Sequence, residues 1–162
     1  MPKARLTIPK FPFPNPKMTL DQFVDQYTDW RWVNPEGRPK VVKAFQKLCL
    51  LLPDKVWLDA PSIRFFAPDS WHHGMCTQIP TSDPETAFIY LAPSLERAPQ
   101  AEVDFTVAHE FAHAVLGHHR DNQALTPKEV KEGYLSFNHE KAADRLAKKW
   151  GFTIPEYRKG KI

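Results

Sequence analysis

The sequence has no long apolar segment, and this absence excludes a membrane-spanning helix. Residues 1–17 include basic side chains but no apolar core, so we expect no secretory signal there. Cysteine is also scarce, with 2 in 162 residues, which suits a protein that is not held together by disulfides. Together these absences predict a cytoplasmic protein without a membrane partner.

A strong excess of one charge is missing too. The formal net charge is +3, and the Lys and Arg residues are dispersed rather than gathered in one stripe with aromatic residues. We therefore expect no nucleic-acid partner. The basic end of the chain, residues 156–162, is interpreted as a solvated tail.

The length of 162 residues fits one domain, and 42% hydrophobic residues can fill its core. No internal repeat is visible. Residues 1–17 contain five prolines and cannot be helical, while Phe11 and Phe13 favour docking of this segment onto the domain or a partner. The expected organisation is a Pro-rich segment over 1–17, a single domain over 18–155 and the tail.

The most informative stretch is His109-Glu110-Phe111-Ala112-His113, an HExxH motif within an apolar run from Ala101 to His119. Residues four apart lie on one face of a helix, so His109 and His113 can bind one metal ion. Glu110 would lie beside that ion as the general base for a metal-activated water. This pattern is typical of a zinc metallopeptidase, although a buried helix with two hydrogen-bonded histidines is the simpler alternative.

A catalytic zinc needs a third protein ligand, and the candidates are His119, Glu140 and His139. The metzincin pattern would use His119, but it requires Gly where this chain has Leu116. It also requires a Met-turn after the motif, and every methionine precedes the motif. Cys76 is a further candidate, as a thiol that could cap the metal.

Glu140 and Asp144 lie one turn apart in a second predicted helix, which runs from Asn138 to Trp150. Glu140 could bind the metal, and Asp144 could accept a hydrogen bond from the free ring nitrogen of His109 or His113. Alternatively, both carboxylates lie on a solvated face and pair with nearby Lys and Arg side chains.

HExxH followed by ExxAD on a second helix resembles the gluzincin class of zinc peptidases, over about residues 86 to 152. The small size is similar to the minimal gluzincins and the ImmA/IrrE-like peptidases. The resemblance implies that His109, His113 and Glu140 bind zinc, that Glu110 is the base and that Asp144 supports a ligand.

The expected activity is therefore zinc-dependent hydrolysis of a peptide or protein substrate. Tyr134, between the two helices, is the preferred donor to the oxyanion, with His118, His119 and His139 as other candidates. Two alternatives stay open: a regulatory or binding protein that keeps the zinc scaffold without cleaving, and a protease dedicated to one partner such as a repressor.

The expected fold is α+β and zincin-like, with a small, mainly antiparallel sheet packed on the HExxH helix and the Glu-bearing helix. Besides those two helices, the pattern predicts helices over Thr19 to about Trp30, Pro39 to about Leu51 and after Thr126, and strands at Val56–Leu58, Ile63–Ala67 and Ala87–Leu91. The last strand is either an interior strand or an edge to which a substrate strand adds.

Overall fold

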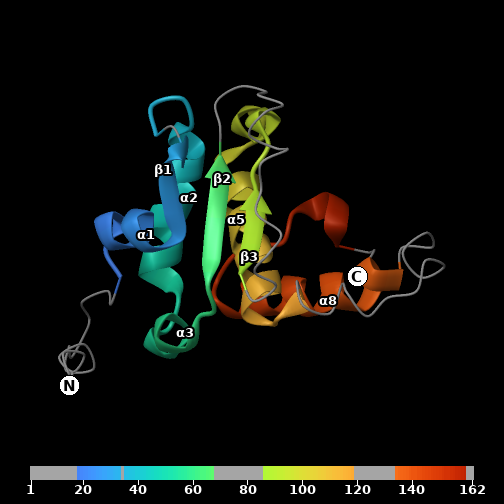
Figure 1. Ribbon diagram of the computed structural model, residues 1–162. Coiled ribbons are helices and arrows are strands. Elements are labelled where there is room, and N and C mark those ends of the chain that lie inside the picture. Colours follow the sequence, from blue (N-terminus) through green and yellow to red (C-terminus); the bar gives the residue numbers. More distant parts are fainter. Residues whose placement is uncertain (1–17, 34, 68–85, 119–133, 160–162) are drawn as a thin grey trace, which may run out of the picture.

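The computed structural model describes residues 18–33, 35–67, 86–118 and 134–159, which form a mixed α+β fold (Figure 1). The helices are α1 (Leu20–Tyr27), α2 (Pro39–Leu51), α3 (Asp54–Asp59), α5 (Gln100–Val115) and α8 (Tyr134–Lys149), with short 3-10 helices η2 (Pro93–Arg97) and η4 (Glu156–Arg158). The strands are β1 (Thr28–Val33), β2 (Ile63–Ala67) and β3 (Ala87–Tyr90). None of the described helices is long and apolar enough to cross a membrane.

The three strands form one sheet in the order β1-β2-β3, and both pairs are parallel. The expected antiparallel sheet is therefore wrong. The physical reason is the long connection between β1 and β2. Helices α2 and α3 carry the chain back to the end of the sheet where β1 began, so β2 runs in the same direction as β1, whereas a short hairpin would make the two strands antiparallel. Ile63 pairs with Ala87 and Phe65 with Ile89, so β2 and β3 are in regular register.

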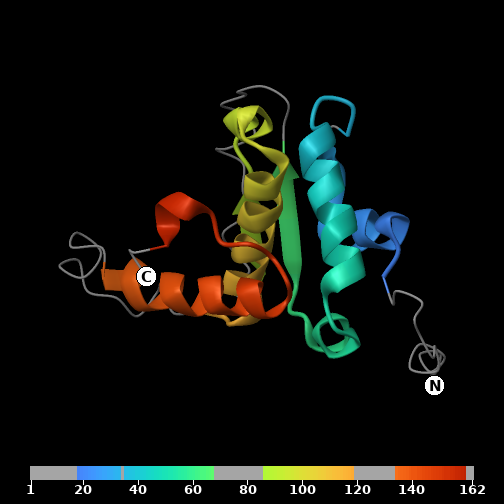
Figure 2. The ribbon, with the colours of Figure 1, turned by 180° about the vertical axis from the view of Figure 1, so that it is seen from behind.

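Helices α2 and α5 lie side by side on one face of this sheet, and α8 crosses α5 near its C-terminal end (Figure 2). The contact with α8 is close because Ala143 and Ala147 are fully buried there. Gly117 and Gly151, which follow α5 and α8, have positive φ angles of 78° and 106°. Such angles are easy for glycine and end each helix where the sequence predicts.

Local sequence explains the other helices. Thr19 and Gln22 form a capping box at the start of α1, and Pro39 occupies the first turn of α2. Helix α1 ends at Tyr27 rather than at about Trp30 as predicted, because the residues from Thr28 onward form β1. The strand predicted at Val56–Leu58 is wrong: these residues belong to α3, which buries Trp57 against the aromatic core.

The aromatic core holds α5 against the rest of the domain. Phe111, the middle residue of the HExxH motif, is fully buried and its ring centroid lies 5.7 Å from that of Tyr27 and 5.6 Å from that of Trp57. Phe65 of β2 stacks on it, and Trp150 after α8 meets it edge-on. One face of α5 is thus fixed in the core, which leaves the histidines to face α8.

Arg38 is completely buried and ties the start of α2 to the end of β3. Its Nη1 and Nη2 donate to the carbonyl oxygens of Leu91 and Ala92 at 2.9 and 2.8 Å, and its Nε donates to Glu96. Glu96 in turn accepts from the backbone N–H of Lys40 and so supplies the N-terminal cap that α2 lacks from its own sequence.

Replacing Arg38 by Met is expected to lower the free energy of unfolding by about 3 kcal/mol, because buried carbonyl groups lose their donor and Glu96 loses its cation. Urea unfolding followed by circular dichroism measures the change. Arg97→Met, on the exposed side of η2, is the matched control and should stay within about 0.5 kcal/mol. Equal stability of the Arg38 variant and the control would contradict this role.

Candidate metal centre

Helices α5 and α8 bring two imidazoles and one carboxylate to a single point. His109 Nε2 and His113 Nε2 lie 3.1 Å apart. Glu140 Oε1 is 3.1 Å from His109 Nε2, and Glu140 Oε2 is 2.8 Å from His113 Nε2. Helical spacing explains the histidines, since positions four apart share a face, and the small alanines of α8 let Glu140 approach them.

The pKa values of Glu140 and His109 are each set by burial and by neighbouring charged groups, which act in opposite directions. Burial raises the pKa of Glu140, but hydrogen bonds from His109, His113 and Arg158 outweigh burial and hold this pKa well below its usual range. Burial lowers the pKa of His109, yet Glu140, with the charges of Glu110 and Asp144, raises it on balance. Glu140 is therefore ionised at neutral pH.

Asp144 lies one turn beyond Glu140 and is only 1% exposed. Its Oδ1 is 2.7 Å from Nδ1 of His109, which is an ion-pair distance without the alignment of a hydrogen bond. The solvated helix face is therefore wrong for Asp144. A carboxylate on the free ring nitrogen fixes the orientation of an imidazole and makes its other nitrogen a better metal ligand.

Asp144→Asn is expected to weaken metal binding by roughly 10- to 100-fold, because partners of ligand imidazoles usually contribute that much. Titration against a chromophoric chelator measures the affinity. Asp59→Asn is the control, since Asp59 lies on the exposed side of α3, where it pairs with Lys55. An unchanged affinity for Asp144→Asn would leave this carboxylate a structural role alone.

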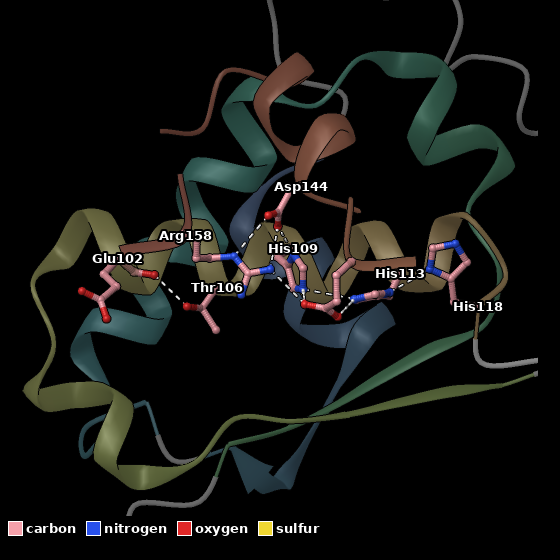
Figure 3. Close-up of polar contacts among 8 residues, drawn as sticks. Glu102, Thr106, His109, His113, His118, Asp144 and Arg158 are labelled. Carbon is pink, nitrogen blue, oxygen red and sulfur yellow. Dashed lines mark hydrogen bonds and ion pairs between the residues drawn. The ribbon is translucent and has the colours of Figure 1, made fainter. Parts of the chain in front are cut away.

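His113 has a different partner at its second ring nitrogen. Its Nδ1 lies 2.7 Å from Nδ1 of His118 (Figure 3). His118 is buried, and its ring stacks on that of His139 at a centroid distance of 4.0 Å. His118 thus contacts the side of His113 that faces away from Glu140. Neither His118 nor His139 joins the three-residue cluster that α5 and α8 form.

Arg158, in η4, is the residue that sequence reasoning missed. The sequence predicts a solvated tail here, but the side chain of Arg158 is only 22% exposed and donates from Nε to Asp144 and from Nη2 to Asp144 and Glu140 (Figure 3). The sequence holds a signal for the turn, because Gly151 ends α8 and is followed by the apolar Phe152, which the structure shows to be buried, but no signal for the carboxylates that Arg158 meets.

The positions of the other predicted site residues are described only in part. Glu110 is partly buried on α5, and its charge contributes to the raised pKa of His109, so it lies close to the cluster. Tyr134 is the first residue of α8, but its side chain lies outside the described residues. His119 and Cys76 lie outside them as well.

Among the residues that the structure describes, His109, His113 and Glu140 therefore form a cluster that could hold a metal ion, with ligand atoms within 4.8 Å of one another. Imidazole nitrogen with carboxylate oxygen is a donor set that suits divalent transition metals. Comparison of the chain with protein-family models, with curated proteins and with solved structures gave no significant match.

Proposed function

We propose that this chain is a zinc-dependent peptidase with a zincin-like fold of the gluzincin type. The observation that carries the proposal is the convergence of His109, His113 and Glu140 from two packed helices, with Glu110 next to His109 in the same helix. Three protein ligands and an adjacent carboxylate are what a catalytic zinc site requires, because the fourth position serves the reaction.

The donor atoms fit a zinc ion. Atoms bound at 2.0–2.1 Å in a tetrahedron lie about 3.3 Å apart. Here the two Nε2 atoms lie 3.1 Å apart, and one oxygen of Glu140 lies 3.1 Å from that of His109 while the other lies 2.8 Å from that of His113, so a small outward movement of the side chains would admit the ion. When bound, zinc would polarise the substrate carbonyl and lower the pKa of a coordinated water.

The chain's own residues have distinct tasks in this proposal. Glu110 accepts the proton of the attacking water and returns it to the leaving amine. Asp144 and His118 hold the outer ring nitrogens of His109 and His113, so that both Nε2 atoms face the metal. Tyr134 is proposed as the donor to the oxyanion from the start of α8.

Strand β3 is the proposed docking edge for the substrate. Among the described strands it pairs with β2 alone, and it packs against α5, which carries the HExxH motif. An extended peptide that adds to this edge would be held by main-chain hydrogen bonds, which give affinity with little dependence on sequence. A general peptidase and a protease for one partner both use such an edge.

A regulatory protein with a purely structural zinc is the other candidate. A structural site uses four protein ligands, whereas the described residues supply three, and a structural site has no use for Glu110. This comparison favours the peptidase.

The test is hydrolysis of an unstructured protein such as casein by zinc-loaded chain, followed by mass spectrometry of the products. Cleavage that stops with a chelator and returns with zinc supports the proposal. Stoichiometric zinc binding without cleavage of casein or of a proteome-derived peptide library would favour the structural site.

A further inference from the structure

Arg158 binds two acidic side chains of α8 at once. Its Nε donates to Oδ2 of Asp144 at 3.1 Å, and its Nη2 donates to Oδ1 of Asp144 at 3.1 Å and to Oε1 of Glu140 at 2.9 Å. The guanidinium also lies 5.9 Å from the ring centroid of Phe105 on α5. It is thus held between the two helices that form the metal cluster.

The contact with Arg158 makes the two oxygens of Glu140 unequal. Both oxygens face a ligand imidazole, Oε1 at 3.1 Å from Nε2 of His109 and Oε2 at 2.8 Å from Nε2 of His113, but Oε1 alone also accepts the hydrogen bond from Arg158. The difference bears on the metal, because a carboxylate that binds through both oxygens occupies two coordination positions. A carboxylate that binds through one oxygen leaves a position open for the reaction.

We propose that Arg158 is a positioning residue that holds Oε1 of Glu140 and thereby makes Glu140 a ligand through Oε2 alone. This inference rests on the metal centre proposed above. The guanidinium stays protonated at any working pH, so its charge and its hydrogen bond persist and direct a cation to the other oxygen. The two bonds to the buried Asp144 fix Arg158 on α8 and prevent it from following Glu140.

A purely structural role for Arg158 makes a different prediction. If Arg158 only anchored η4 to α8, its loss would change stability but not the number of ligand atoms around the metal. The metal affinity alone does not separate the two roles, because two effects of losing Arg158 oppose each other. Loss of its positive charge strengthens the binding of a cation, whereas a less ordered Glu140 weakens it. The number of ligand atoms does separate them.

Cobalt(II) is the probe, since four-coordinate cobalt absorbs visible light much more strongly than five-coordinate cobalt. The cobalt-loaded wild-type chain is expected to show the intense bands of four coordination. Arg158→Met should bind one cobalt per chain but lose these bands, because Glu140 then binds through both oxygens. Lys159→Met removes a positive charge from the adjacent residue, whose Nζ pairs with Glu156, and should keep the wild-type spectrum.

An Arg158→Met spectrum identical to that of the wild type would overturn the inference and leave the metal centre intact. If the wild type itself binds neither cobalt nor zinc, the metal centre and the inference both fail. If circular dichroism shows that Arg158→Met does not fold, Arg158→Lys is measured instead. Its ammonium keeps the charge but not the fork that bonds both carboxylates, so the bands should still weaken, and a wild-type spectrum would again overturn the inference.

Discussion

Glu140→Gln is expected to abolish tight zinc binding, while the wild-type chain holds one zinc. The amide keeps the shape of the side chain but lacks the negative charge that faces His109 Nε2 and His113 Nε2 at 3.1 and 2.8 Å. Because Glu140 is a direct ligand in the proposed centre, the loss of affinity should exceed the roughly 100-fold upper range for residues that only support a ligand. Elemental analysis after gel filtration, with a chelator titration, gives content and affinity.

The matched control for this experiment is Glu102→Gln, the same substitution on α5. Glu102 is partly exposed, and its backbone carbonyl accepts a hydrogen bond from the hydroxyl of Thr106. Its variant should bind zinc as the wild type does. If Glu140→Gln keeps its zinc while His119→Ala loses it, the third ligand is His119 and the gluzincin assignment is wrong.

The sequence predicts those features that depend on neighbouring residues. Pro39 marks the start of α2 and Gly117 follows the end of α5, because proline and glycine act through their own backbone angles. The pairing of His109 with His113 follows from the pitch of one helix. These features need no knowledge of the rest of the chain.

The ExxAD pattern also predicts that Glu140 and Asp144 meet the histidines of α5. Two other features that depend on distant segments are not predicted. The parallel direction of β1 and β2 is set by the return of the chain through α2 and α3, and the strand sequences carry no sign of it. Arg158 reaches Asp144 across 14 residues only because the chain turns at Gly151. From sequence alone, a basic residue near the end of a chain is interpreted as solvated, because its carboxylate partners become visible only in the folded structure.

Glu110→Gln is expected to leave one zinc per chain and the fold intact but to reduce the rate of peptide hydrolysis by roughly 10²- to 10⁴-fold. The amide cannot accept the proton of the attacking water, whereas His109, His113 and Glu140 are unchanged. Turnover of a susceptible peptide by chains of verified zinc content measures the effect, with Glu102→Gln as the control on the same helix.

Two results separate the possible roles of Glu110. Loss of both zinc and activity would mean that its charge supports the metal site, in keeping with its effect on the pKa of His109. Equal turnover by the variant and the wild type would remove Glu110 as the general base, and with it the strongest reason to prefer catalysis over a structural zinc.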